Sequence, residues 1–125
     1  MKRILIVDDD KLLRAGLAAV LSRRGYEVLQ AGDGEEAFSL AQTKNPDLVI
    51  TDIMMPKVSG VELLGKIRHT VWGENVPIIV LTIKDTDIEN VNQTLQIGTG
   101  AYLSKAEVSP DDVASLVDQY LKENT

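Results

Sequence analysis

Cysteine is absent from the sequence, and histidine occurs once. There is therefore no disulfide framework, no catalytic thiol and no cysteine-ligated zinc, and an all-histidine metal site is excluded. No run of apolar residues approaches the roughly 18 that a membrane-spanning helix needs. The apolar run after Lys2 and Arg3 is four residues long and meets three aspartates at once, which argues against a signal peptide.

An excess of positive charge is also missing. The 13 Lys and Arg residues stand against 19 Asp and Glu residues, which gives a formal net charge of -6. A protein that binds nucleic acid directly needs a basic surface to match the phosphate backbone. We therefore expect a cytoplasmic protein that contacts neither nucleic acid nor a membrane directly.

The sequence does have enough apolar material for one domain. Its 125 residues are near the commonest domain size, and 44% of them are hydrophobic. Charged residues make up 26%, an ordinary share for a globular protein. Because no linker or internal repeat divides the chain, we expect a single domain over residues 1–125.

Short aliphatic runs alternate with amphipathic segments along the chain. The aliphatic runs predict five strands, at residues 3–7, 26–30, 48–51, 76–81 and 101–103. Apolar residues at helical spacing follow each run and predict five helices. The predicted helix starts are Ser59, Thr86 and Ser109-Pro110, and the predicted ends are Gly25 and Gly98.

Five consecutive strand–helix units predict an α/β fold. The expected architecture is a flavodoxin-like (βα)5 protein, a doubly wound five-stranded parallel sheet with helices on both faces. Right-handed crossovers leave few strand orders, and 2-1-3-4-5 is a common one. In such a sheet ligands bind beyond the carboxyl ends of the strands, where the strand order reverses.

Polar residues stand where several predicted strands end. Asp8, Asp9 and Asp10 follow the first strand, and Asp52 follows the third, its neighbour in the predicted order. Thr82 follows the fourth strand, and Lys105 comes shortly after the fifth. Carboxylates this close repel one another unless one is protonated or a cation binds. Mg²⁺ is the natural cation, because it commonly binds a few carboxylates and phosphate oxygens at the same time.

A purely structural interpretation accounts for part of this set. Aspartate is favoured at a helix start, and Asp10 is the best candidate for that role. The same reasoning does not account for Asp52, which follows Thr51 and precedes the apolar Ile53-Met54-Met55. A charge at the end of a buried strand is costly unless it is paired. We therefore interpret the constellation as a functional site.

These positions and their flanking segments resemble the receiver domain of bacterial two-component response regulators. The matching segments are residues 4–9, 46–56, 59–60, 77–82 and 98–105. The resemblance implies a module that accepts a phosphoryl group on Asp52 from a phosphohistidine of a sensor kinase or phosphotransfer protein. It implies a signalling module that promotes its own phosphorylation and dephosphorylation, not an enzyme acting on other substrates.

The resemblance also implies a role for each neighbour. Asp9 and Asp52 would bind Mg²⁺ directly together with the Met54 carbonyl, and Asp8 would act through water. Lys105 would pair with the phosphoryl group. Thr82 would hydrogen-bond a phosphoryl oxygen, and Tyr102 would rotate into the space that Thr82 vacates, as in a two-state packing switch.

Two residues depart from the family pattern. Ile83 stands where a small residue usually follows the switch threonine, and it should narrow access to the phosphoryl group. Ala106 stands where a cis proline usually follows the lysine. Because a cis bond before a residue other than proline costs about 3–4 kcal/mol, we expect a trans Lys105–Ala106 bond. The flexible stem of Lys105 should still bring its ammonium group to Asp52.

Two other functions remain as alternatives. A Mg²⁺-dependent aspartyl phosphatase would usually place its nucleophile after the first strand and carry a cap segment, for which this chain has no room. A receiver-like module that binds partners without phosphorylation would be favoured by Ile83 and Ala106, whereas the intact Asp9, Asp52, Thr82 and Lys105 argue against it.

The charges divide between two predicted faces. Lys11, Arg14, Arg23 and Arg24 lie on or beside the first helix, whereas residues 85–121 hold seven acidic residues and Lys105 as their one basic residue. We expect the kinase to dock near the first helix, and an unknown protein to receive the output. Because the second face lacks basic residues for cross-subunit ion pairs, we expect a monomer or a weak dimer.

Overall fold

The computed structural model describes residues 1–52, 60–82, 101–105 and 108–123. Five parallel strands form one sheet in the order β2-β1-β3-β4-β5, which confirms the predicted α/β fold and strand order. The strands are β1 (Arg3–Val7), β2 (Glu27–Ala31), β3 (Leu48–Thr51), β4 (Ile78–Thr82) and β5 (Ala101–Ser104).

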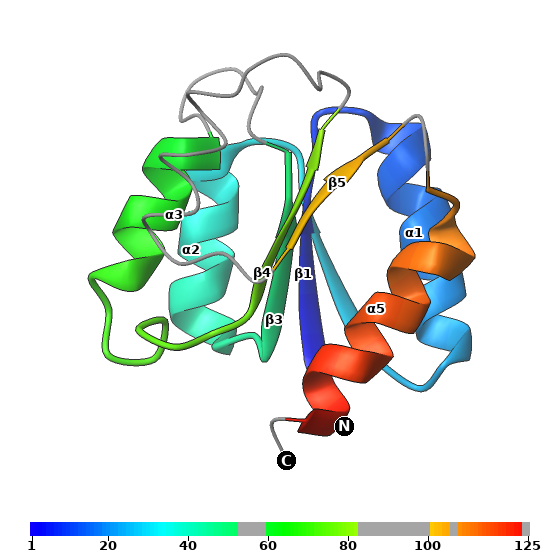
Figure 1. The fold of residues 1–125 in the computed structure, drawn as a ribbon. Coiled ribbons are helices and arrows are strands. Elements are labelled where there is room, and N and C mark those ends of the chain that lie inside the picture. The colour runs from blue at the N-terminus through cyan, green and yellow to red at the C-terminus, as the bar shows by residue number, and fades with distance from the viewer. Residues whose placement is uncertain (53–59, 83–100, 106–107, 124–125) are drawn as a thin grey trace.

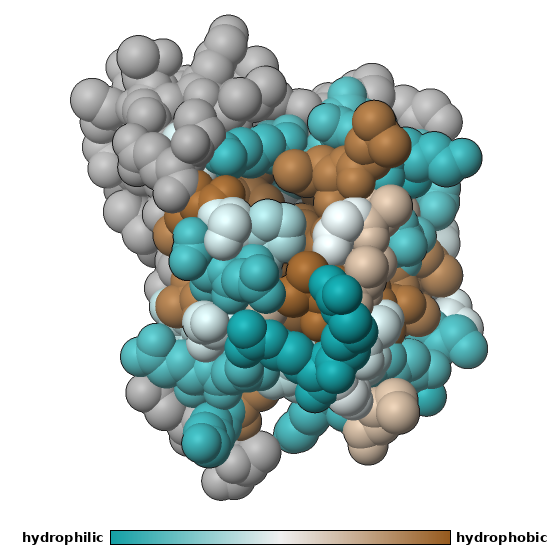
Figure 2. Space-filling model, turned by 90° about the vertical axis from the view of Figure 1, so that its right-hand side faces the viewer, coloured by the Kyte–Doolittle hydropathy of each residue, from teal (hydrophilic) through white to brown (hydrophobic). Residues whose placement is uncertain are grey.

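Helices cover both faces of the sheet. The described helices are α1 (Lys11–Arg23), α2 (Gly34–Lys44), α3 (Gly60–Arg68) and α5 (Pro110–Glu123). In Figure 1, α1 and α5 lie on one face of the sheet and α2 and α3 on the other. Figure 2 looks onto the side of α1 and α5, where hydrophilic side chains cover much of the surface and hydrophobic patches lie among them. The helix predicted between the fourth and fifth strands lies outside the described residues.

Each face of the sheet has its own apolar core. Successive residues of β1, such as Ile4 and Leu5, point to opposite faces of the sheet, and both are fully buried. Ile4 packs in the core beneath α1 and α5, which includes Leu17 and Val117. Leu5 packs in the core beneath α2 and α3. The nearly continuous apolar character of the central strands follows from this burial on both sides.

The helix ends follow the sequence signals where these are described. Asp10 caps α1, and its carboxylate accepts hydrogen bonds from two backbone N–H groups of the first turn. Gly25 follows α1 with φ +95°, a conformation that suits glycine. Ser109 and Asp112 form a reciprocal capping box at the start of α5. The predicted signals at Ser59, Thr86 and Gly98 lie outside the described residues.

Three strands differ from the prediction by one or two residues at their ends: β2 and β4 at both ends, and β5 at its carboxyl end, which is Ser104 instead of residue 103. The second strand begins at Glu27 because the Tyr26 N–H still bonds to the Leu21 carbonyl and completes the turn after α1. The fourth strand begins at Ile78 because the Val76 carbonyl accepts a hydrogen bond from Arg68 at 2.7 Å instead of joining the sheet. The predicted strands at residues 3–7 and 48–51 match β1 and β3.

Candidate functional site

The site lies at the carboxyl ends of β1 and β3, which are neighbours in the sheet. Val7 of β1 pairs with Thr51 of β3, and Asp8 and Asp52 are the next residues after these two, so they lie side by side. The Asp52 N–H donates to the Val7 carbonyl at 3.0 Å, and the Asp8 N–H donates to the Ala31 carbonyl of β2 at 3.1 Å. The sheet hydrogen bonds therefore hold the backbone of both aspartates.

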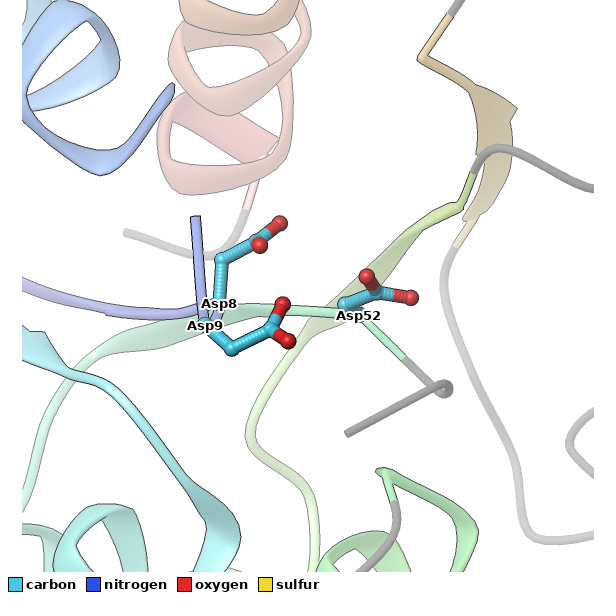
Figure 3. Close-up of side chains that lie close together, drawn as sticks. All are labelled: Asp8, Asp9 and Asp52. Carbon is cyan, nitrogen blue, oxygen red and sulfur yellow. The ribbon is translucent and has the colours of Figure 1, made fainter. Parts of the chain in front are cut away.

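Three carboxylates gather at this point. Asp8, Asp9 and Asp52 each offer a carboxylate oxygen, and these oxygens lie within 4.8 Å of one another. Figure 3 shows Asp8 and Asp9 leaving the end of β1, with the Asp9 carboxylate pointing toward Asp52. Asp8 and Asp52 are buried, at 2% and 3% exposure, whereas Asp9 is exposed. Asp9 therefore leaves the cluster open to solvent on one side.

Lys105 provides a positive charge from the end of β5. Its ammonium Nζ lies 2.5 Å from Asp8 Oδ2 and 2.8 Å from Asp52 Oδ2, and its side chain is 11% exposed. The expectation that Lys105 reaches Asp52 is confirmed. One ammonium faces three carboxylates, so the cluster keeps a net negative charge when all its groups are ionised.

Burial and the neighbouring charges shift the pKa values of Asp8 and Lys105. Burial raises the pKa of Asp8 above its ordinary value, although Lys105 and the Asp10 N–H, which donates to Asp8 Oδ1 at 2.9 Å, pull it down. Burial by itself would lower the pKa of Lys105, but its bonds to Asp52 and Asp8 outweigh burial, so that pKa is raised. Lys105 therefore stays charged, and further positive charge would stabilise the ionised carboxylates.

The donor set fits a hard divalent cation. Carboxylate oxygens on Asp8, Asp9 and Asp52 are the ligands that Mg²⁺ prefers, and Asp9 is open to the water that Mg²⁺ usually retains. Asp10 does not belong to this set, because its carboxylate caps α1. The carbonyl predicted from Met54 lies outside the described residues.

Several predicted residues are placed only in part. Thr82 ends β4, where it pairs with Ser104, and Tyr102 pairs with Val80. The side chains of Thr82 and Tyr102 lie outside the described part of the structure, as do Ile83 and Ala106. The predicted trans Lys105–Ala106 bond therefore also lies outside it.

Arg14 is a neighbour of the site that sequence reasoning assigned to the basic face of α1. Its guanidinium turns back toward the loop after β1, where Nη1 donates to the Asp8 carbonyl at 2.5 Å. Its position four residues after the cap Asp10 was the available signal, because helical side chains lean toward the N-terminus of their helix. Arg24 is also engaged, since its Nη1 lies 2.5 Å from Asp118 Oδ2 of α5.

This combination of fold and site defines a class: an α/β protein with an acidic, lysine-paired site at the strand ends. The sequence matches the profile of the response regulator receiver domain over residues 4–118. It is 38% identical over 121 residues to the alkaline phosphatase synthesis transcriptional regulatory protein PhoP of Bacillus subtilis, covering 97% of this chain and 49% of that protein. It is 44% identical over 103 residues to the response regulator MprA of Mycolicibacterium vanbaalenii, covering 82% of this chain and 43% of that protein.

Solved structures agree with the sequence comparisons. A CheY-like response regulator receiver domain protein from Methanospirillum hungatei superposes with a TM-score of 0.91 at 32% identity, covering 98% of this chain and 95% of that one. The chemotaxis protein CheY4 of Vibrio cholerae superposes with a TM-score of 0.87 at 29% identity, covering 95% and 98%. The chain belongs to the receiver domain family of two-component response regulators, a family of signalling modules.

The chain spans about half the length of the two curated relatives named above. Among the described helices, none is both long and apolar enough to cross a membrane.

Proposed function

We propose that this protein is a phosphorylation-controlled switch that accepts a phosphoryl group on Asp52 from a phosphohistidine. The observation that carries the proposal is the position of Asp52 itself. Its buried carboxylate lies at the end of a central strand, paired with Lys105 and beside two further carboxylates. A buried carboxylate with one cationic partner and an open, metal-compatible side is suited to receive a phosphoryl group.

The transfer itself needs little covalent chemistry from the protein. The phosphorus–nitrogen bond of the donor breaks, and its electron pair stays on the imidazole nitrogen, which then takes up a proton. A phosphorus–oxygen bond forms at a carboxylate oxygen of Asp52 and gives an acyl phosphate. Lys105, already 2.8 Å from Asp52 Oδ2, would neutralise part of the incoming charge.

Asp9 and Asp52 would hold Mg²⁺ directly together with the Met54 carbonyl, and Asp8 would act through water. When bound, Mg²⁺ supplies charge neutralisation to the phosphoryl oxygens. Asp8 is buried and already paired with Lys105, which suits a more indirect role than that of the exposed Asp9.

The response to phosphorylation would pass through Thr82 and Tyr102. The phosphoryl group adds up to two negative charges and three acceptor oxygens at the end of β3. Thr82 ends the adjacent strand β4, and Tyr102 lies on β5 beside it. A hydrogen bond from the Thr82 hydroxyl to the phosphoryl group would open a space for Tyr102 to enter.

The partners follow from the same chemistry. A sensor histidine kinase or a phosphotransfer protein would donate the phosphoryl group, docking near the solvent-exposed start of α1 beside the site. The output would pass to another protein, or to an output domain in a longer chain, since this chain spans about half the length of the relatives named above. Residues 1–125 would form a single receiver domain in the cytoplasm, without direct contact with nucleic acid or membrane.

The contact between Lys105 and Asp52 weighs against a receiver-like module that lacks phosphorylation. Such a module has no need to keep a lysine and a carboxylate paired within a largely buried site, where unpaired charge is costly. Turnover of many equivalents of a phosphoester would instead support the phosphatase alternative.

Mass spectrometry after treatment with acetyl phosphate and Mg²⁺ tests the proposal. The parent chain should gain one phosphoryl group, and Asp52→Asn should gain none because its amide cannot act as the nucleophile. Asp10→Asn is the matched control, since asparagine caps a helix as well as aspartate does and the cluster is left intact. Equal labelling of the parent and Asp52→Asn would disprove the assignment.

A further inference from the structure

Arg14 occupies an unusual position beside the acidic cluster. It lies in the first turn of α1, where its N–H donates to the Asp10 carbonyl at 3.1 Å. Its Nη1 donates to the Asp8 carbonyl, whereas its Nε is buried and has no hydrogen-bond partner among the described residues. A buried donor without a partner is destabilising, and an apolar side chain at this position would avoid that cost.

The guanidinium group lies close against Gly32, the residue that follows β2. A Cβ atom at Gly32 would lie 3.3 Å from Arg14 Nη1, closer than most Cβ contacts, and 3.9 Å from Cζ, an ordinary contact. The absence of a side chain at Gly32 therefore leaves room for the guanidinium between the start of α1 and the end of β2.

The carbonyl that Arg14 binds belongs to the peptide bond between Asp8 and Asp9. The Asp8 N–H is held by Ala31, and its Oδ1 accepts the Asp10 N–H. Arg14 adds a hydrogen bond on the carbonyl side of Asp8, and this bond restricts rotation of the Asp8–Asp9 peptide plane. The direction of the exposed Asp9 side chain depends on that plane.

We propose that Arg14 is a positioning residue for the metal-binding carboxylates, and that it raises Mg²⁺ affinity by holding the Asp8–Asp9 peptide in place. This inference rests on the proposed function, because it assumes that Asp8 and Asp9 serve a Mg²⁺ site. Gly32 contributes to this positioning, because a side chain there would crowd the guanidinium of Arg14. Groups that orient metal ligands from behind commonly change metal affinity about 10–100-fold when they are removed.

The direction in which Arg14→Met changes Mg²⁺ affinity distinguishes a positioning role from the effect of the charge alone. Arg14 is a cation beside a cation site, so electrostatics alone predicts that Arg14→Met binds Mg²⁺ more tightly. Positioning predicts the opposite, because the peptide bearing Asp9 loses its restraint. Arg14→Lys keeps the charge and an N–H donor group but loses the planar guanidinium, and its Mg²⁺ affinity should fall between those of the parent and Arg14→Met.

Isothermal titration calorimetry of the full chain with MgCl₂ is the primary measurement. We expect Arg14→Met to weaken Mg²⁺ binding about 10-fold and Arg14→Lys to recover part of that loss. Arg23→Met is the matched control, because it removes an exposed arginine from the last turn of the same helix. Its Mg²⁺ affinity should equal that of the parent.

Gly32→Ala tests the positioning role of Arg14 without changing any charge. The φ angle of Gly32 lies outside the left-handed region, so alanine fits its backbone, and the new methyl group forces the end of the Arg14 side chain to shift by a few tenths of an ångström. Because that shift weakens the hydrogen bond from Arg14 to the Asp8 carbonyl, we expect Mg²⁺ binding about two- to threefold weaker than in the parent, and no further loss when Gly32→Ala is added to Arg14→Met. Because Gly32→Ala and Arg14→Lys are mild changes, they keep the test decisive if Arg14→Met fails to fold.

The outcomes separate this inference from the function on which it rests. Equal or tighter Mg²⁺ binding by Arg14→Met, or equal losses from Gly32→Ala in both backgrounds, would overturn the role of Arg14. If the parent and Arg14→Met then also accept a phosphoryl group equally well, the proposed function is supported and only the role of Arg14 is overturned. A parent chain that binds no Mg²⁺ and accepts no phosphoryl group would overturn both.

Discussion

Asp8, Asp9 and Asp10 are consecutive residues with three different environments. Asp8 is buried and paired with Lys105, Asp9 is exposed and points toward Asp52, and Asp10 caps α1. The divergence follows from the chain leaving a parallel strand and entering a helix within three residues. Three identical side chains at adjacent positions therefore make different contacts.

This difference predicts separable effects of two alanine substitutions. Asp9→Ala should strongly weaken Mg²⁺ binding and phosphorylation while leaving the start of α1 intact, because Asp9 belongs to the carboxylate cluster. Asp10→Ala should lower the free energy of unfolding by about 1 kcal/mol through loss of the cap, with little change in Mg²⁺ affinity. Calorimetric titration and urea unfolding of both variants check this. Similar losses of Mg²⁺ affinity in the two variants would show that the wrong members of the triplet were chosen.

At the scale of elements, a polar cluster joins the end of α1 to α5. Asp118 of α5 accepts hydrogen bonds from Arg24 Nη1 and from the Tyr26 hydroxyl, each at 2.5 Å. Burial would raise the pKa of Asp118, but these two bonds outweigh it and hold that pKa below its ordinary value. Burial and the bond to Asp118 together raise the pKa of Tyr26 to about 12.

Asp118→Asn should therefore cost stability in a pH-dependent way. The folded-state pKa of Asp118 lies below its unfolded value, so its contribution is present above about pH 4 and disappears as the pH falls through the folded pKa. The side chain is 40% exposed, so we expect a loss of only about 0.5–1 kcal/mol at pH 7. Urea unfolding between pH 3 and pH 7 checks this, with the two proteins converging at the acidic end. A difference that does not change with pH would contradict the ionic origin.

At the scale of the whole molecule, charges on the face of α1 and α5 pair partly within the chain. The face of α1 and α5 has basic groups on α1 and acidic groups on α5, and some of these already pair within the chain. Arg24 lies 3.9 Å from Asp111 and 2.5 Å from Asp118. These carboxylates have an internal cation, which reduces their gain from pairing with a second molecule.

We therefore expect no ion-paired dimer built on α5. Light scattering of the beryllofluoride-treated protein with Mg²⁺ should show a monomer or a weak dimer, because residues 85–121 hold seven acidic residues and a single basic one, Lys105, which is largely buried in the site. Lys122 in the last turn is the one basic residue that α5 itself adds. The untreated protein is the control for the effect of activation. A tight dimer that is lost when Asp111 and Asp118 are replaced by asparagine would contradict this expectation.

The sequence by itself determined the arrangement of layers and pointed to the residues of the candidate site. Continuous apolar runs such as β1 and β3 require burial on both faces, and aspartates at their ends stand out because a charge there needs a partner. Asp10 and Ser109 were recognisable as helix caps because capping is a local interaction over three residues. Other local signals were missed, such as the Asp33 cap of α2 and the left-handed Asn45 at its end.

The tertiary structure decided the contacts between residues far apart in the chain. Lys105 meets Asp8 and Asp52 because the strand order brings the ends of β1, β3 and β5 to one edge of the sheet. Arg14 looked like part of a basic docking face, but the packing of α1 beside Gly32 turns its guanidinium to the Asp8 carbonyl. Spacing along the sequence records local periodicity, whereas the pairing of such groups depends on how the layers pack, because the energy of a charge depends on what lies around it in space.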